Sequence, residues 1–465
     1  MNYARAAVLI FVLVTTCSIT SLLAQDLTPK EFVEPQPVLP LPGQLSDVPL
    51  FNSNNPEVVQ SEGILLSTLS PQGKATPNAH LDYLFQGDFG IFSHHIARPF
   101  DDKDKRTLYQ GLILFNPGDV DAKVEVRSGA SYLSQPDSPF IELPAQLPNP
   151  HGKIHAGPGG RVSDDVLRGR RPKSRLIKHE VTVRPQEAVV IARLPIPVGK
   201  WNPPLNGRST LLHLSVKAGA VQAADVAVYG KFDSKGKEIK PENQEFIDVL
   251  TKGDLAGPRE KPATAPGAPG PFAYGRVAGV SQGTTWNSVA TEATGAPVQQ
   301  SFPIALPGEQ FSFVVSALQH GSFGSGQDQA APLAVRYPET AYRAHGNYGV
   351  FYDLALTLEN NQEQAHDVDI IFQTPLKADK KSAGLQFASP PYKPVFFRGT
   401  VRVSYPDSRG KLRTRHFHLI QHRGEQGQPL ATVHILPGQS RNVVLQFVYP
   451  PDATPPQVLT FRTLR

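Results

Sequence analysis

The chain has 465 residues, enough for two ordinary domains that each bury their own hydrophobic core. Its hydrophobic content of 40% excludes an intrinsically disordered protein, and its 45 prolines and 38 glycines are typical of many short strands joined by turns. The net charge of +5 is mild, so it slightly favours anionic partners and excludes no class of partner.

The first 24 residues predict a secretory signal peptide. Arg5 precedes an unbroken apolar run over residues 6–14, and small residues lead to Ala24 before Gln25. The apolar run is too short for a membrane-spanning helix, which needs about 20 residues, and no later stretch reaches that length. We therefore expect an exported protein of the periplasm or cell envelope, with a mature chain that begins at Gln25 and has no transmembrane segment.

Cys17 is the only cysteine of the sequence, and it lies inside this signal. A bacterial lipoprotein would be cut just before such a cysteine and acylated on it, but Thr16 is a poor residue for the position before that cut. We favour plain cleavage over lipidation. The mature chain then has no disulfide, no thiol nucleophile and no cysteine-ligated metal, and we expect no cofactor.

The pattern along the chain divides it into an arm and two strand-rich parts. Residues 25–60 are rich in proline and predict an extended arm or linker. Short apolar runs bounded by Gly, Pro or Asn predict strands over residues 61–256 and again over 272–465. A Pro/Gly-rich linker at 257–271 has too few apolar residues for a core, and it marks the predicted domain boundary.

One short helix is predicted at the end of the first strand-rich part. Pro241 suits a first helical turn, Phe246, Val249 and Leu250 share one face, and Gly253 is a stop signal.

The two strand-rich parts resemble diverged copies of one unit. Each contains a strand, an Asn-marked turn and a strand with period-two alternation, over residues 112–126 and 354–370. A Gly-[Asp/Asn]-[Phe/Tyr]-Gly-[Ile/Val]-Phe sequence precedes each, and a turn followed by a strand comes later, at 183–191 and 435–445. We therefore predict an all-β fold of two tandem immunoglobulin-like β-sandwich-type domains with one short helix between them.

Several specific runs give nearly the whole mature chain a family resemblance. They are VPLFNSN at 48–54, SYLSQPD at 131–137, PLNGRST at 204–210, DLAGPR at 254–259, RYPETAYRAHGNYG at 336–349 and YPPDATPP at 449–456. In these runs the chain resembles a family of exported cyanobacterial proteins that is known only as a domain of unknown function. The resemblance implies a periplasmic or envelope setting and brings no activity with it.

No catalytic motif was found in the sequence. The Gly-rich stretch at 321–326 is not followed by Lys-Ser/Thr or a helix pattern, so a flexible hairpin tip explains it better than a phosphate loop. No Gly-x-Ser-x-Gly elbow exists, so a serine hydrolase of that kind has no support. We predict no catalytic residue.

His416, His418 and His422 are weak metal candidates. Residues two apart on a strand point the same way, so the first two imidazoles could reach one ion. A third ligand four residues on would need a bend, and no nearby carboxylate completes the set. We favour histidines on a solvated strand face over a metal site.

The densest polar-aromatic run is residues 336–349, and it allows two interpretations. It could form a glycan or peptide site with stacking tyrosines and hydrogen-bonding polar groups, or it could be a long connection whose tyrosines pack and whose charged pairs hold the loop. We favour the structural interpretation. The candidate ligand-binding residues of this run are Arg336, Tyr337, Tyr342, Arg343, His345 and Tyr348.

A basic stretch over residues 398–423 gives the partner hypothesis. Asp407 to Gly410 predicts a hairpin tip, so Arg402 on one strand and Arg413 and Arg415 on the next could form a single basic strip. Its partner would be an anionic polysaccharide of the cell envelope. Nucleic acid is not expected for an exported chain without a recognised binding motif.

Together these features predict a non-catalytic envelope or periplasmic protein with a binding or structural role. The alternative is a polysaccharide-acting enzyme that uses a pair of carboxylates drawn from scattered Asp and Glu, about 5–9.5 Å apart across a cleft. The sequence does not define an oligomeric state.

Overall fold

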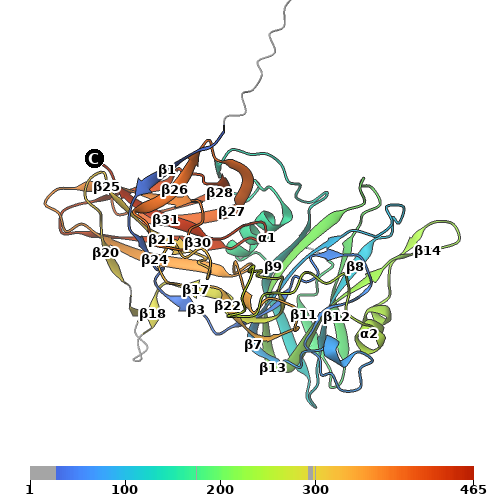
Figure 1. The fold of residues 1–465 in the computed structure, drawn as a ribbon. Coiled ribbons are helices and arrows are strands. Elements are labelled where there is room, and N and C mark those ends of the chain that lie inside the picture. Colours follow the sequence, from blue (N-terminus) through green and yellow to red (C-terminus); the bar gives the residue numbers. More distant parts are fainter. Residues whose placement is uncertain (1–27, 174, 292–296, 299) are drawn as a thin grey trace, which may run out of the picture.

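The computed structural model describes residues 28–173, 175–291, 297–298 and 300–465, so the predicted signal peptide and Cys17 lie outside the described residues. Strands form most of the regular structure, with two α-helices and one 3₁₀ turn, η1 (Pro77–Ala79), in the described chain. The predicted all-β class is confirmed (Figure 1). No helix of the described part is long and apolar enough to cross a membrane.

The largest sheet has twelve strands and is built mainly from the first half of the chain. Its strands are β4 (Pro49–Ser53), β5 (Val58–Val59), β6 (Gly63–Ser67), β7 (Phe85–Ala97), β8 (Leu108–Phe115), β9 (Ala122–Leu133), β11 (Glu180–Val183), β12 (Ala188–Ile196), β13 (Asn206–Tyr229), β16 (Ala278–Gln282), β22 (Ala331–Arg336) and β23 (Arg343–Ala344).

The long strand β13 joins the two layers of this sheet. Its first part pairs with β7 and β9, and its last part pairs with β6 and β8. The register with β7 shifts between Val216 and Val221, where Gly219 has a φ of +72°, a conformation that glycine adopts without steric cost. Both layers contribute to one apolar core, for example Phe89 from one and Leu114 from the other.

Two further sheets, built mainly from the second half of the chain, face each other across a single apolar core. The eight-stranded sheet contains β3 (Gln44–Leu45), β10 (Gln146–Pro148), β17 (Thr285–Asn287), β20 (Ser301–Pro303), β24 (Phe351–Glu359), β27 (Tyr392–Pro406), β28 (Leu412–Arg423) and β30 (Ser440–Val448). The five-stranded sheet contains β2 (Val38–Leu39), β21 (Gln310–Val315), β25 (His366–Gln373), β29 (Pro429–Ile435) and β31 (Gln457–Thr463).

Period-two alternation produces this packing. Along β24 every second residue is buried, so Tyr352, Leu354, Leu356 and Leu358 all face the core. Three two-stranded pairs complete the fold, namely β1 (Lys30–Pro35) with β26 (Gly384–Ser389), β14 (Lys231–Phe232) with β15 (Glu238–Ile239), and β18 (Ala290–Thr291) with β19 (Pro297–Val298).

The two helices differ in how well the sequence predicted them. The expected helix is α2 (Asn243–Lys252), which begins with a capping box between Glu242 and Glu245. Its fully buried Phe246 packs against Gly111, where a Cβ atom would lie 2.4 Å from the ring. The prediction of one helix is wrong, because α1 (Pro158–Leu167) was missed. Its PGG start reads as a turn, yet nine of its ten residues are buried by neighbouring strands.

The segments predicted to be copies share one pairing pattern. In the first half β8 pairs with β12 and β9 pairs with β11, whereas in the second half β24 pairs with β30 and β25 pairs with β29. The Gly-rich sequences ahead of them do not correspond, because residues 87–92 lie inside β7 and most of 346–351 forms the turn before β24.

The turns between the paired strands contain equivalent asparagines. The Nδ2 of Asn116 donates to the carbonyl oxygens of Val120 and Val183 at 2.7 and 2.9 Å. The Nδ2 of Asn360 donates to those of Gln364 and Ile435 at 2.7 and 2.9 Å. The same pair of asparagine hydrogen bonds therefore occurs in both halves, as the duplication hypothesis requires.

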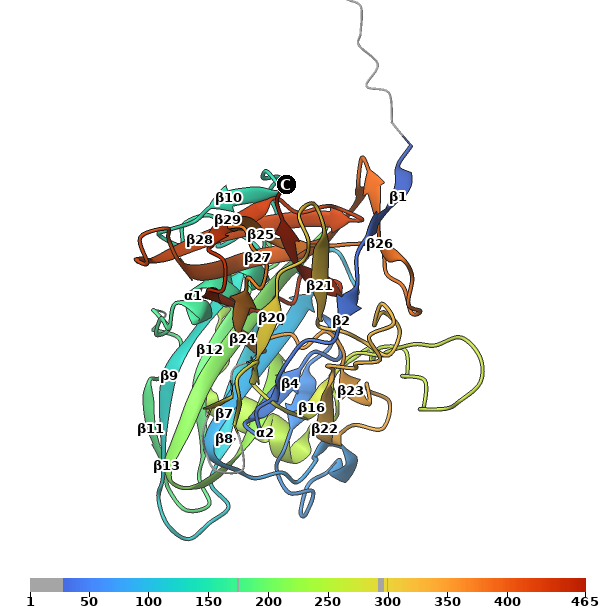
Figure 2. The ribbon, with the colours of Figure 1, turned by 90° about the vertical axis from the view of Figure 1, so that its left-hand side faces the viewer.

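Strand pairing crosses the predicted domain boundaries in both directions. The described part of the predicted Pro-rich arm, residues 28–60, contains the strands β1 to β5, which pair with strands of both halves. From beyond the linker, β16 lies between β4 and β22 in the twelve-stranded sheet. From the first half, β10 pairs with β28. Figure 2 shows the blue N-terminal segment running along strands of the second half. The boundaries at 61–256 and 272–465 therefore do not match the sheets.

Candidate functional site

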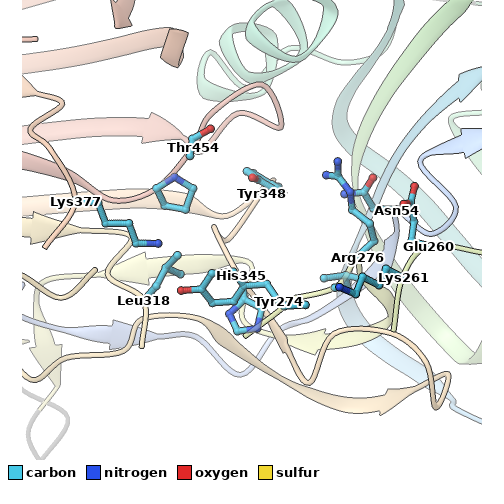
Figure 3. Close-up of a pocket in the computed structure, with 14 residues that line it drawn as sticks. Asn54, Glu260, Lys261, Tyr274, Arg276, Leu318, His345, Tyr348, Lys377 and Thr454 are labelled. Atoms are coloured by element: carbon cyan, nitrogen blue, oxygen red, sulfur yellow. The ribbon is translucent and has the colours of Figure 1, made fainter. Parts of the chain in front are cut away.

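A cavity of about 370 Å³ lies where segments from both halves meet the linker. Its walls come from the residue after β4 and from the end of the linker and the segment that follows it, within residues 260–277. Loops after β21 and β25 and loops before β24 and β31 complete the lining. Figure 3 shows its principal side chains, which are Asn54, Glu260, Lys261, Tyr274, Arg276, Leu318, His345, Tyr348, Lys377 and Thr454.

Two aromatic rings in contact, with their planes tilted by 56°, form one wall of the cavity. The ring centroids of Tyr274 and His345 are 4.3 Å apart, and Phe272 packs edge-on against Tyr274 at 4.7 Å. The Tyr274 hydroxyl donates to the carbonyl oxygen of His320 at 3.1 Å, and burial raises its pKa to about 12. The phenol therefore stays protonated at neutral pH and holds its ring in place.

Positive charge lies at both ends of this aromatic wall (Figure 3). Lys377 lies at one end, with its Nζ 5.2 Å from the Tyr274 ring centroid, and Lys261 and Arg276 lie at the other end. Arg276 is partly neutralised because it pairs with Glu57. Although burial opposes ionisation of Glu57, the hydrogen bond from His94 and the charge of Arg276 lower its pKa. Among the described lining residues, Glu260 alone carries a carboxylate.

Two buried polar atoms of the cavity wall are left without a hydrogen-bond partner in the described structure. They are the Oδ1 of Asn54, a residue with 3% exposure, and the Nδ1 of His345. Burial, with the nearby charges of Arg343 and Lys377, lowers the pKa of His345 to about 4, so its imidazole is neutral at pH 7. Buried polar atoms usually have a partner, so these two atoms mark unused hydrogen-bonding capacity in the cavity wall.

The polar-aromatic run at 336–349 is used mainly to hold its own loop. Arg336 donates to the carbonyl oxygens of Tyr337, Pro338 and Thr340 and lies 3.7 Å from the ring centroid of Tyr342. Arg343 donates to the carbonyl oxygen of Ala330 at 2.7 and 3.0 Å.

Among the described residues of this run, only those near its end reach the cavity. His345 and Tyr348 line it, and the Tyr348 hydroxyl donates to the carbonyl oxygen of Ala453 at 2.9 Å.

The three arginines of the expected basic strip do not share one face. Arg402 is opposite His416 in the β27–β28 hairpin, whereas Arg413 is opposite Tyr405 and Arg415 is opposite Val403. Directly opposed residues point to the same side of a sheet, so Arg402 lies on one face while Arg413 and Arg415 lie on the other. Arg402 also donates to Gln446 at 2.8 Å, and Arg413 pairs with Asp407 at 2.8 Å. The structure therefore does not form the strip.

Two of the three histidines of the weak metal hypothesis have separate local contacts. His418 is fully buried with its Nε2 3.3 Å from the amide nitrogen of Ala156, and burial lowers its pKa to about 3. The Nδ1 of His422 lies 2.7 Å from the carbonyl oxygen of Lys393. Across the described residues, no group of three His, Cys, Asp or Glu side chains gathers closely enough to hold a metal ion.

A second cavity of about 450 Å³ beside α1 brings Asp137 and Asp165 into one lining. Both carboxylates already have partners. Asp165 accepts from the Tyr132 hydroxyl at 2.6 Å and pairs with Arg170, and Asp137 accepts from the amide nitrogen of Leu133 at 2.9 Å. These contacts stabilise the loops around α1.

Most of the first cavity was missed from the sequence. Lys261 lies in the predicted linker, which was interpreted as a passive connection, and Tyr274, Arg276 and Lys377 lie in segments without a recognised motif. The FAYGR sequence at 272–276, with two aromatic residues and an arginine directly after a Pro/Gly-rich stretch, was the available signal.

The fold and the cavity define an all-β protein of several packed sheets with a cationic, aromatic cavity. Residues 36–463 match the family model described as "Protein of unknown function (DUF3370)", and the chain belongs to that family. A search of curated proteins found no match.

Similarity to solved structures is weak. Tripeptidyl peptidase 2 is 12% identical with a TM-score of 0.19, over 88% of this chain and 24% of that one, so this chain spans about a quarter of its length. Pumpkin seed globulin is 9% identical with a TM-score of 0.10, over 87% and 85% of the two chains. A Campylobacter jejuni multicopper oxidase is 9% identical with a TM-score of 0.10, over 90% of each. Scores this low carry no argument about function.

Proposed function

We propose that this protein is a non-catalytic binding protein that holds an acidic saccharide in the cavity around Tyr274. The observation that carries the proposal is the combination of an aromatic wall, cations at both of its ends and unpartnered buried polar atoms. A sugar ring stacks on an aromatic face, its hydroxyls donate to acceptors such as the Oδ1 of Asn54, and its carboxylate pairs with Lys377 or Lys261.

The enzyme alternative has less support at this cavity. Glycoside hydrolysis needs two carboxyl groups about 5–9.5 Å apart, and the described lining has one, from Glu260. We further propose that the protein is exported and acts at the cell envelope, where acidic glycans are found. The assignment of the two repeated units as immunoglobulin-like stays a prediction.

Binding of oligogalacturonate, a chain of uronic acids, tests the saccharide proposal. We expect binding by isothermal titration calorimetry that weakens with salt, since the ion pairs are partly exposed. The double variant Lys261→Gln/Lys377→Gln should bind at least about tenfold more weakly, because two charge-assisted contacts are lost. Tyr274→Ala should weaken the binding of both charged and neutral saccharides, because it removes the stacking surface.

The control is Arg413→Gln/Arg415→Gln, which removes two exposed cations from the second half and should leave the affinity unchanged. Equal affinity of the cavity double variant and the native protein, or no binding at low salt, would remove the proposal. Release of new reducing ends from the oligosaccharide would favour the enzyme instead.

A further inference from the structure

Three loops at one end of the twelve-stranded sheet carry exposed apolar side chains. They are residues 98–107 between β7 and β8, residues 197–205 between β12 and β13, and residues 230–240, which contain the β14–β15 hairpin. We call them together the three-loop end. Phe100 is 75% exposed, Phe232 50%, Ile239 52% and Leu205 40%.

Specific contacts hold these loops next to one another. The amide nitrogen and hydroxyl of Thr107 donate to the carboxylate of Glu238 at 2.5 and 2.8 Å, and the guanidinium of Arg106 lies 4.5 Å from the ring centroid of Tyr229. A Cβ atom on Gly199 would lie 3.1 Å from the carbonyl oxygen of Lys105. The β14 hairpin stands out from the body on this side (Figure 1). The apolar side chains therefore project from one supported end.

The charge of these loops is strongly positive. They contain nine Lys and Arg and five Asp and Glu, a formal charge of +4, whereas the whole chain carries +5. Three of the acids already have partners within the loops. Asp104 pairs with Arg106, the carboxylate of Asp233 accepts hydrogen bonds from turn amides, and that of Glu238 accepts one from the Thr107 hydroxyl. The exposed lysines are Lys103, Lys200, Lys231, Lys235, Lys237 and Lys240, of which Lys231 pairs with Glu245.

We propose that the three-loop end docks on the surface of an anionic lipid bilayer. Exposed aromatic and aliphatic side chains enter the interface between headgroups and acyl chains, and lysines around them pair with acidic headgroups. A purely ionic partner, such as an acidic polysaccharide, would explain the lysines but not Phe100, Phe232 and Ile239. Exposed apolar side chains gathered at one basic end are typical of an interaction surface.

Vesicle sedimentation tests this proposal. We expect the full chain to bind vesicles that contain phosphatidylglycerol, to bind pure phosphatidylcholine vesicles far less, and to lose binding as salt screens the lysines. The variant Phe100→Ser/Phe232→Ser/Ile239→Ser should lower the partition coefficient at least about tenfold. The variant Lys235→Gln/Lys237→Gln/Lys240→Gln should lower it too, and it leaves the apolar groups intact.

The β27–β28 hairpin offers a matched control. Its turn, Asp407-Ser408-Arg409-Gly410-Lys411, has the hydrogen bonds of Asp233-Ser234-Lys235-Gly236-Lys237, with the amide nitrogens two and four residues on donating to the aspartate in both. Exposed Leu412 follows it. The variant Arg409→Gln/Lys411→Gln/Leu412→Ser should keep native binding. If the variants of both hairpins lost vesicle binding equally, the binding would depend on the overall charge of the protein and not on the three-loop end, and the proposal would be overturned.

Tryptophan fluorescence gives a second readout. The chain has two tryptophans, of which Trp201 lies in the three-loop end and Trp286 is 5% exposed in the core of the second half. Brominated lipids should quench Trp201 on binding, and the quenching should persist in a Trp286→Phe variant. Failure of the native chain to bind anionic vesicles, or binding without quenching of Trp201, would contradict docking through this end.

Discussion

Tyr337, a candidate ligand-binding residue in the sequence, has a structural role in the folded protein. Its side chain is fully buried in the core of the first half, where its hydroxyl donates to the carbonyl oxygen of Ala79 at 2.7 Å and accepts from the amide nitrogen of Ser67 at 3.0 Å. The guanidinium of Arg259 lies 5.2 Å from the ring centroid. The hydroxyl and the ring of Tyr337 both have partners within the fold. The side chain therefore holds the two halves together and is not available to a ligand.

Buried histidines make stability depend on pH. Burial lowers the pKa of His213 to about 4 and that of His418 to about 3, below the unfolded value of about 6.5. The unfolded state therefore takes up protons first as the pH falls. The stability from these neutral rings is fully present above pH 6.5 and is lost as the pH falls toward 4. Each ring should contribute at most about 1.4 kcal/mol per pH unit in that window.

Urea unfolding at pH 7, 6 and 5 checks this dependence. The His213→Gln and His418→Gln variants should show a shallower loss of unfolding free energy than the native chain. Exposed His151 supplies the control, since His151→Gln should keep the native slope. Identical slopes for all three variants would mean that carboxylates alone set the pH response.

At the scale of elements, the two Asn-marked turns have equivalent structural roles. Asn116 is 1% exposed and Asn360 is fully buried, and each side chain bonds the turn and the neighbouring strand. Replacement by alanine removes the donor to one buried carbonyl oxygen, that of Val183 or Ile435, and to one partly buried carbonyl oxygen in the turn itself. We expect Asn116→Ala and Asn360→Ala each to lower the free energy of unfolding by about 2–3 kcal/mol.

Exposed Asn361, next to Asn360, is the control for this prediction. Its alanine variant should stay within about 0.5 kcal/mol of the native chain in chemical unfolding. A loss at Asn361 equal to that at Asn360 would show that the turn depends on local propensity and not on the buried hydrogen bonds.

At the scale of the whole molecule, the halves interlock. β16 lies between β4 and β22, α1 contacts β27 and β30, and the carboxylate of Asp452 accepts from the amide nitrogen of Gly159 at 3.1 Å. Separating the halves would expose unpaired strand edges and apolar surface, which costs far more than cutting one loop.

A cut in the linker should therefore leave one particle. Residues 265–270 are exposed, so an engineered protease site there can be cleaved in the folded protein. We expect the nicked chain to elute from a sizing column with the intact chain, to unfold in a single transition and to separate into two fragments in denaturant. Two fragments that separate under native conditions would instead indicate independent domains.

The sequence by itself determined the features that depend on neighbouring residues. Alternation along β24 and the Pro/Gly turns set the all-β class, and the start and stop signals marked α2. The repeated strand-turn-strand segments marked β8 with β9 and β24 with β25 as equivalent strands. Each of these depends on backbone preferences and side-chain direction over a few residues, so it can be read locally.

Only the tertiary structure decided what depends on register and on contacts between distant segments. The separation of Arg402 from Arg413 and Arg415 follows from one register in the β27–β28 hairpin, and a shift of one residue would have put them on the same face. The cavity brings Asn54, Tyr274, His345 and Lys377 together from four separate segments. No pattern within one segment predicts that these residues lie together. Their arrangement depends on the free energy of burying the two halves against each other.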